Sequence, residues 1–331
     1  MSSFSFFIFS GYDHHMIPQL FCNPIPCAEI LLNDNEYHIR PTDNTLPDSN
    51  LKKNICQTGI LHPPLLQKIT DKSYIILSGR KRILAGISLG MREIPCLIMA
   101  KQANSMLKWQ TILSHALIGS RLSIIEQAIF FSKAEPQLTI EEQLDLLPLL
   151  NLKPQQYILQ ELAKYLTLAP ITIHALHTGI LQEKIGKKLV KLCFDDQEMV
   201  VNLVRYYKLG GSKQKKLVSS AIDLVMRSGR PFREILDTWE RKHPAKASNR
   251  PQRAMALLSW LESQCFPGRT SAQKEFEKFQ RQLHMPGNAG VRPSPSFEDE
   301  TLTLSLTFNN KHDFLRNWEA IQNILMDAKD N

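Results

Sequence analysis

The stretch at residues 59–99, GILHPPLLQKITDKSYIILSGRKRILAGISLGMREIPCLIM, decides the fold of the N-terminal part of the chain. Its apolar residues at 65–69 and 74–77 indicate two strands joined by a short turn, and residues 94–99 indicate a third strand. Residues 78–82, Ser-Gly-Arg-Lys-Arg, open a helix between the second and third strands. The pattern predicts a small sheet with a helix inserted between two of its strands.

A glycine followed by three cations lies at the start of that predicted helix. Gly79 lets backbone N–H groups approach an anion closely, and a helix N-terminus carries a partial positive charge. Arg80, Lys81 and Arg82 add full positive charges beside it. This corner is therefore a candidate phosphate-binding site, and a solvated basic turn without a ligand is the alternative.

The same stretch resembles the N-terminal domain of ParB-type chromosome and plasmid partition proteins, which belong to the ParB/sulfiredoxin superfamily. The resemblance rests on Gly59-Ile60-Leu61-His62-Pro63-Pro64, Tyr74, Gly79-Arg80-Lys81-Arg82, Ala85, Gly90 and Ile94-Pro95. In that family a Gly-Glu-Arg-Arg motif, followed after one residue by Arg-Ala, contacts the phosphates of cytidine triphosphate (CTP). The resemblance implies a nucleotide or phosphate site, with CTP as the candidate ligand, at Gly59, His62, Pro63, Gly79, Arg80, Lys81 and Arg82.

Two departures from the family pattern bear on activity. Arg80 replaces the acidic residue of the motif, and Leu84 replaces its later arginine. The family has a Glu-Asn pair in the next helix that helps to hold magnesium, and the matching positions here are His115 and Ala116. An oxygen-ligated magnesium site cannot be built from these two residues. We therefore assign no metal site and no catalytic residue, and we expect little or no nucleotide hydrolysis.

The chain as a whole is expected to be an α+β protein. After residue 101 the strand pattern gives way to helical spacing over about 200 residues. The expected segments are a poorly defined N-terminal segment at 1–24, a ParB/sulfiredoxin-like domain at 25–101, an all-helical middle domain at 102–240, a linker at 241–251 and a small α+β C-terminal module at 252–331. The first helices of the middle domain are expected at 104–118, 123–134, 139–147 and 154–166, with Ser123 and Thr139 as caps.

A helix-turn-helix template fits residues 154–178 with two weaknesses. Thr167 stands where a glycine is usual, and the second helix offers no Arg, Lys, Asn or Gln for bidentate contact with a base edge. Ala163 is expected to let the two helices approach each other. Sequence-specific readout through this helix is therefore doubtful, although Thr172 and His174 are its candidate DNA contacts.

Positive charge is concentrated directly after this region. Twelve Lys and Arg residues face only four acidic residues between Lys184 and Arg233, a local excess as large as the net charge of +8 of the whole chain. Such an excess fits a polyanion, although a solvated lysine-rich helix face gives the same pattern. The candidate contacts to DNA phosphates are Lys184, Lys187, Lys188, Lys213, Lys215 and Lys216.

The C-terminal module is expected to contain one strand and three helices. Residues 301–308 alternate between polar and apolar side chains and indicate a strand, whereas residues 285–295 are expected to form a loop. A final helix at 311–326 is expected to bury Phe314, Trp318, Ile321 and Leu325. A lone strand needs a partner, so self-association into a homodimer is a natural role for this module.

Composition excludes several classes of protein. No apolar run of about 18 residues occurs, so no membrane span is expected, and the cytoplasm is the default location. The six cysteines form no CxxC pair, which argues against a zinc site.

Three functions remain open from the sequence. The first is a ParB-like DNA-associated protein with a nucleotide-binding N-terminal domain. The second is a phosphotransferase or nuclease on the same scaffold, for which Glu36 would be the acid to test. The third is a non-enzymatic adaptor whose lysines contact an acidic protein.

Overall fold

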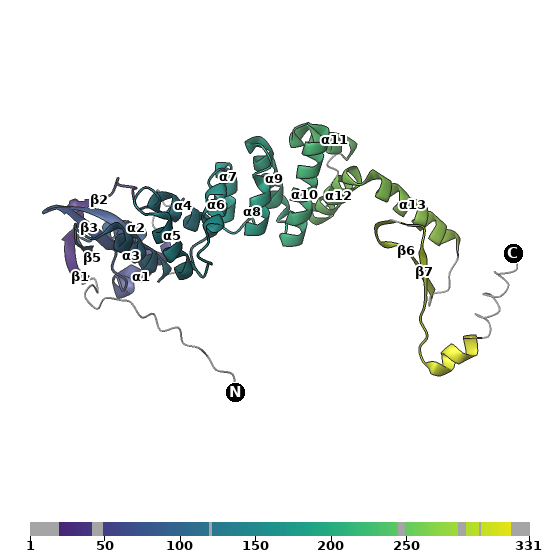
Figure 1. The fold of residues 1–331 in the computed structure, drawn as a ribbon, viewed down its shortest axis with the longest axis horizontal. Helices are drawn as coiled ribbons and strands as arrows, with labels where there is room; N and C mark the ends of the chain where they lie inside the picture. Colours follow the sequence, from purple (N-terminus) through teal and green to yellow (C-terminus); the bar gives the residue numbers. More distant parts are fainter. Residues whose placement is uncertain are drawn as a thin grey trace. The chain divides into compact units, whose positions relative to one another are not determined.

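The computed structural model describes residues 20–41, 49–118, 121–243, 249–283, 289–297 and 299–318. The chain divides into two compact units, Met1–Val218 and Ser219–Asn331, with the division inside helix α10, Gly211–Ser228 (Figure 1). Most of the N-terminal segment at 1–24 and half of the expected linker at 241–251 lie outside the described residues.

The first unit begins with a five-stranded mixed sheet. Its strand order is β1-β5-β3-β4-β2, so β3 lies in the middle, parallel to β5 and antiparallel to β4. β1 runs antiparallel to β5, with Ile25 opposite Ile94. The strands are β1 Phe21–Pro26, β2 Ile30–Leu31, β3 Leu65–Thr70, β4 Ser73–Ser78 and β5 Glu93–Met99.

The strands expected at 65–69, 74–77 and 94–99 are confirmed as β3, β4 and β5. Their apolar residues form a core with the first strands and with helix α2, Arg80–Ser88. Burial of β-branched and aromatic side chains from sheet and helix explains why this stretch sets the local fold. The core cluster consists of Ile25, Ile30, Leu66, Tyr74, Ile76, Ile83, Ile94 and Cys96.

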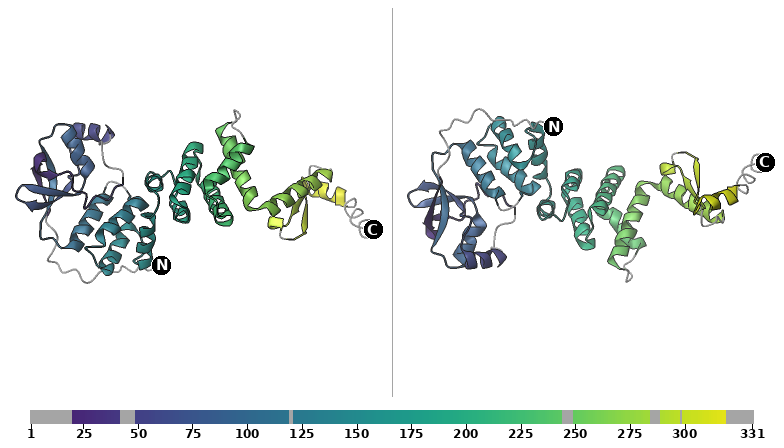
Figure 2. Two further views of the ribbon diagram at one scale, coloured as in Figure 1. Left: turned by 90° about the horizontal axis from the view of Figure 1, so that it is seen from above. Right: turned by 90° about the horizontal axis from the view of Figure 1, so that it is seen from below.

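Helices take over after β5. Asn104, Ser123 and Thr139 cap the starts of three of them through their side chains, as residue types of this kind do at N-caps. α3 contacts β4, α4 contacts α6 and α7, and Figure 2 shows these helices beside the sheet in both views. The helices are α3 Ser105–Leu117, α4 Ile124–Ala134, α5 Ile140–Leu146, α6 Gln156–Tyr165, α7 Pro170–His177, α8 Glu183–Leu189 and α9 Phe194–Tyr207.

The helix-turn-helix arrangement is present as α6, a short turn and α7. Ala163, which was expected to allow close approach of the two helices, is instead exposed. Leu162 and Tyr165 carry the buried face of α6, with 3% and 2% exposure. An exposed Ala163 does not lie between the two helices, so the expectation for this residue was wrong.

The second unit contains helices and a two-stranded sheet. α12, Arg250–Cys265, buries Leu257, Leu258 and Leu261, and the sheet pairs β6, Ala289–Pro293, with β7, Leu302–Leu306. The other helices are α11 Phe232–Lys242 and α13 Pro267–Gln282. The strand expected at 301–308 is confirmed as β7, but the loop expected at 285–295 is wrong at β6, which supplies the missing partner within the same chain.

The last described helical segment spans residues 311–318. Phe314 and Trp318 were expected to be buried, but they are 36% and 39% exposed. Their rings lie 5.1 Å apart, and Phe314 also contacts Phe308 at 5.2 Å, so the aromatic side chains cover one another only in part. Ile321 and Leu325 lie outside the described residues. Within the described ranges, none of the helices has the length and apolar character to cross a membrane.

Candidate nucleotide site and nucleic-acid interface

A pocket of about 270 Å³ opens at the junction of β4 and α2. One wall is the segment 37–40, the floor is the end of β4 with the first turn of α2, and α3 contributes Ile112 and Ala116. The pocket is lined by Tyr37, His38, Ile39, Arg40, Leu51, Ile76, Leu77, Ser78, Gly79, Arg80, Lys81, Arg82, Ile112 and Ala116. Four of these residues are Arg or Lys, and no carboxylate among the described residues lines the pocket.

Gly79 makes this corner possible. It caps α2 with φ of 90°, a left-handed conformation that residues with a side chain rarely adopt. A Cβ atom at this position would lie 2.9 Å from the Cα atom of Pro64, closer than two such carbons can approach. The glycine therefore lets the chain turn tightly past Pro64 and expose the first N–H groups of α2 to the pocket.

Two of the pocket arginines are held by backbone carbonyl groups. Arg80 donates to the carbonyl oxygens of Leu32, at 2.7 Å, and of Asp34. Arg82 donates to the carbonyl oxygen of His62. Burial, and secondly the charge of Arg40, lower the pKa of Arg82. These partners orient the guanidinium groups but do not neutralise them, so the pocket keeps its positive charge.

Gly59, His62 and Pro63 were predicted to bind phosphate, but they do not line this pocket. Gly59 ends helix α1, Ser49–Thr58, with φ of 73° and a hydrogen bond from its N–H to the carbonyl of Ile55 at 2.9 Å. His62 and Pro63 supply the carbonyl oxygens that anchor side chains of the site. In this structure His62 and Pro63 therefore support the site through their backbone, whereas Gly59 makes no contact with it that the structure shows.

The His115 side chain is held by the carbonyl oxygen of Pro63. From the sequence, His115 was considered only because it stands where the family has a residue that helps to hold magnesium. Its Nε2 lies 2.9 Å from the carbonyl oxygen of Pro63, and its Nδ1 lies 2.8 Å from the hydroxyl of Ser78. A carbonyl can only accept, so Nε2 carries a proton and, in the neutral ring, Nδ1 accepts from Ser78. Burial lowers the pKa of His115, and the hydrogen bond to Pro63 opposes that shift. The imidazole thus joins α3 to the strand ends beneath the pocket.

The wall at 37–40 is fastened to the helical part of the unit. Lys133 of α4 donates to the carbonyl oxygens of Asn35 and of Glu36, the latter at 3.2 Å. The Glu36 carboxylate accepts from Gln137 at 3.0 Å. Glu36 is exposed and does not line the pocket, so the enzyme alternative that relied on it gains no support from its position.

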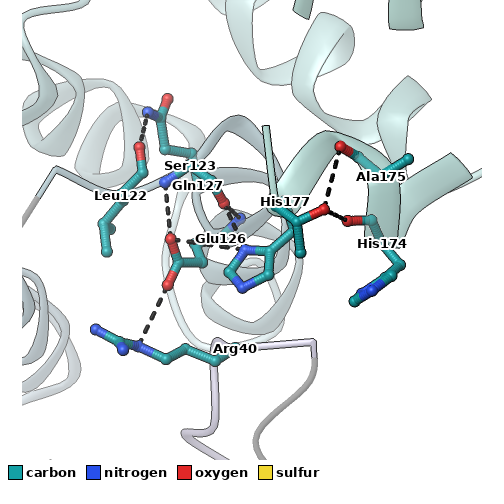
Figure 3. A network of polar contacts seen from close by, with 9 residues as sticks. Arg40, Leu122, Ser123, Glu126, Gln127, His174, Ala175 and His177 are labelled. Atoms are coloured by element: carbon teal, nitrogen blue, oxygen red, sulfur yellow. Dashed lines mark hydrogen bonds and ion pairs between the residues drawn. The ribbon is translucent and has the colours of Figure 1, made fainter. Parts of the chain in front are cut away.

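Arg40 links the pocket to the helix-turn-helix region through a buried carboxylate (Figure 3). Its Nε lies 3.2 Å from Oε1 of Glu126, which is 5% exposed. Oε2 of Glu126 accepts from the backbone N–H of Ser123 at 2.7 Å, closing a capping box on α4. Nδ1 of His177, at the end of α7, lies 4.0 Å from the same Oε2 and 2.9 Å from the Ser123 hydroxyl. Sequence reasoning missed all of this network except for the helix cap.

The predicted DNA contacts divide into two groups. Lys184, Lys188, Lys213 and Lys215 have exposed side chains, as does His174 on α7. Lys216 is half-buried, whereas Thr172 is 0% exposed, which closes it to a DNA groove in this structure. We therefore leave Thr172 out of any proposed surface.

Lys187 is exposed but already has an acidic neighbour. Its Nζ lies 2.9 Å from Oε2 of Glu161, and Lys164 lies 2.7 Å from Oε1 of the same residue. Hydrogen bonds from Lys164 and Lys187 lower the pKa of Glu161 to about 2. A DNA phosphate would have to compete with this carboxylate for Lys187.

The pocket does not fit a magnesium ion held by protein oxygens. Magnesium needs one or two carboxylates beside the nucleotide phosphates. Both ring nitrogens of His115 are occupied, and Ala116 offers no ligand atom. Among the described residues, no group of three or more His, Cys, Asp or Glu side chains is arranged to hold a metal ion.

Comparison with known proteins finds a matching family and similar proteins. A sequence model of the family described as ParB N-terminal domain matches residues 25–114. A nucleoid occlusion protein of Bacillus cytotoxicus is 26% identical over 227 residues, covering 62% of this chain and 74% of the relative. A nucleoid occlusion protein of Bacillus cereus is 25% identical over the same length and coverage.

Among solved structures, the C-terminally truncated chromosome-partitioning protein ParB of Caulobacter crescentus, complexed to the centromeric parS site, is 15% identical with a TM-score of 0.35. The match covers 60% of this chain and 98% of that one. The sequence matches, together with the α+β architecture and the glycine-opened helix, confirm the resemblance found in the motifs. Residues 25–114 of this chain therefore match the ParB N-terminal domain, as the motifs indicated.

Proposed function

We propose that this chain is a ParB-like DNA-associated protein of the cytoplasm whose N-terminal pocket binds a nucleoside triphosphate and whose helical domain binds DNA phosphates. The observation that carries the nucleotide part is the pocket itself. Arg40, Arg80, Lys81 and Arg82 line it without a carboxylate, at the N-terminus of α2. CTP is the first ligand to test, because the Gly79 motif resembles one that contacts CTP phosphates.

Electrostatics support an anionic ligand at this place. Like charges gathered in a partly buried site repel one another. After burial, the charge of Arg40 is the second cause of the lowered pKa of Arg82. A polyphosphate removes that repulsion and accepts hydrogen bonds from guanidinium groups and from the N–H groups of the helix N-terminus. The pocket is therefore better suited to a polyanion than to a neutral ligand.

The DNA part rests on the lysines of α8 and α10. Lys213, Lys215 and Lys216 lie in the first turn and a half of α10, where positive charge opposes the helix dipole. Helix stability does not explain cations there, whereas contact with phosphates does. Such contacts give affinity and salt dependence without base preference, which fits an α7 that presents no base-reading side chain. Kinship to nucleoid occlusion proteins supports the same assignment.

The C-terminal unit supports self-association in this proposal. Leu302, Leu304 and Leu306 of β7 are 50%, 57% and 37% exposed, and Leu315 is 57% exposed. An exposed apolar strand is costly in water and is a ready surface for a second chain. We propose a homodimer formed through this unit.

The test of DNA binding is fluorescence anisotropy with a labelled duplex over a series of salt concentrations. The wild type is compared with Lys213/Lys215/Lys216→Ala and with the control Lys274/Lys278/Arg281→Ala, which removes three exposed cations from α13. We expect wild-type affinity to fall with salt, and the logarithmic slope to become shallower by up to about 2 to 3 in the α10 variant only.

Two results would contradict the proposal. Absence of duplex binding at low salt would remove DNA as the partner and favour the adaptor, in which the same lysines contact an acidic protein. Equal loss in the α10 variant and the α13 control would show that binding depends on total charge and not on this surface.

A further inference from the structure

The charge inventory of the pocket points to a ligand of a particular form. Nucleotide sites that use magnesium place carboxylates beside the phosphates, because the metal ion adds two positive charges that the protein must balance. Here the charged residues of the lining are cations, and no carboxylate from the described part of the chain joins them. A magnesium ion would therefore meet repulsion where it usually meets a ligand.

His115 stands where the family has a metal-holding residue, but its ring nitrogens already have other partners. The His115 ring is 6% exposed and bridges Ser78 and Pro63 through both nitrogens. Releasing either nitrogen would leave a buried polar group without its partner, which destabilises the fold. His115 is thus a positioning residue under the pocket floor, and it does not become a ligand without loss to the fold.

The arginines supply what the metal otherwise provides. Arg40 and Arg82 bring two guanidinium groups to the same pocket, and Arg80 and Lys81 extend the positive charge along the first turn of α2. Guanidinium groups bind phosphate oxygens in bidentate fashion and stay charged at all relevant pH values. One of these charges is already paired, since Nε of Arg40 lies 3.2 Å from the Glu126 carboxylate. The cluster therefore offsets most of the charge of a triphosphate of about −4 without a metal ion.

We propose that this pocket takes its triphosphate free of divalent cation, with the cluster Arg40, Arg80, Lys81 and Arg82 in the place of magnesium. The inference rests on the proposed nucleotide-binding function and specifies the form of its ligand. Metal-bound triphosphate, which carries about two fewer negative charges, is the poorer ligand. Since magnesium depletes the free form, it weakens apparent binding by mass action.

The test is isothermal titration calorimetry of the full chain with CTP, in EDTA and in millimolar magnesium at matched ionic strength. We expect the apparent Kd to be lower in EDTA by about tenfold. Binding that is tighter in magnesium than in EDTA would overturn the inference while leaving the nucleotide site intact. Absence of binding in both buffers would overturn the inference together with the proposed function.

A pair of variants on α3 makes the test independent of absolute affinity. Ala116→Asp places a carboxylate in the pocket lining without touching the His115 bridge, and Ser114→Asp places one on an exposed position two residues away. We expect Ala116→Asp to lower affinity in EDTA and to reverse the preference between the two buffers. Ser114→Asp should keep the wild-type preference. If Ala116→Asp also keeps it, with thermal unfolding showing a folded protein, the cation-only account of the pocket is wrong.

Discussion

Glu126 offers the sharpest test of how the pocket wall and the helix-turn-helix region are held together. Its carboxylate accepts from the Ser123 N–H at 2.7 Å, pairs with Arg40 at 3.2 Å and lies 4.0 Å from Nδ1 of His177. Its side chain is 7% exposed, so water replaces little of what a mutation removes. Glu126→Ala should therefore destabilise the first unit more than the loss of a helix cap does.

The magnitude follows from the separate contacts. Loss of a capping side chain costs about 1 kcal/mol. Breaking a fully buried ion pair costs about 3–5 kcal/mol, but the Arg40 side chain is 34% exposed and can reach water, which reduces that contribution to about 1–2 kcal/mol. Glu126→Ala should then cost about 2–3 kcal/mol, and Glu126→Gln, which keeps an oxygen for the Ser123 N–H, about 1–2 kcal/mol.

The assay is thermal unfolding followed by circular dichroism, with Glu142→Ala as the matched control. Glu142 closes the same capping box on α5 with Thr139, at 2.9 Å, so its variant reports the cap by itself. For a unit of this size each kcal/mol lowers Tm by about 2–4 °C, so we expect a fall of about 4–12 °C for Glu126→Ala. A fall no larger than that of Glu142→Ala would refute the reasoning, because the ion pair would then contribute nothing.

Three further predictions follow from the site. Gly79→Ala should destabilise the protein by more than about 2 kcal/mol in chemical denaturation and abolish CTP binding. A left-handed φ costs a residue with a side chain about 1–2 kcal/mol, and the new Cβ would also clash with Pro64. The control Gly90→Ala, with φ of 79° and no atom within 4 Å of its Cβ, should show only the cost of the left-handed φ. The pKa of His115 is lowered in the folded state, so the unfolded chain takes up a proton more readily than the folded chain. Tm should therefore fall as pH drops below about 6.5. The same dependence of Tm on pH in His115→Gln would contradict this explanation. Glu161→Gln frees Lys164 and Lys187 from their carboxylate and should tighten duplex binding at low salt in anisotropy measurements, and unchanged affinity would exclude Lys187 from the DNA surface.

Local patterns were sufficient to predict the elements that fold from neighbouring residues. The alternation of apolar residues at 65–77, Gly79 before the cations and the caps Ser123 and Thr139 all act within a few positions of the chain, and the structure confirms the strands and helices they predict. β6 was missed because Gly290 and Pro293 are typical of loops. Pairing with β7, not local propensity, makes that segment a strand.

Only part of the site could be predicted from the sequence, because the rest depends on residues far apart along the chain. The types and spacing of residues 79–82 predicted this side of the pocket. The opposite wall, with Arg40, is about 40 residues away along the chain and carries no motif. The partner that fixes His115 is a backbone carbonyl 52 residues away, and any residue type can supply a carbonyl. Tertiary contacts of this kind leave no trace in residue spacing.

The central claim is that the cationic corner at α2 is a nucleotide site. Equilibrium binding of CTP to the wild type, to Lys81→Glu and to the control Lys72→Glu tests it most directly, since Lys81 lines the pocket and Lys72 is exposed in the turn between β3 and β4. We expect Lys81→Glu to raise Kd by about tenfold or more, because one attraction becomes a repulsion, and Lys72→Glu to leave Kd unchanged. Equal affinity of the three proteins, or no CTP binding by the wild type, would contradict the account.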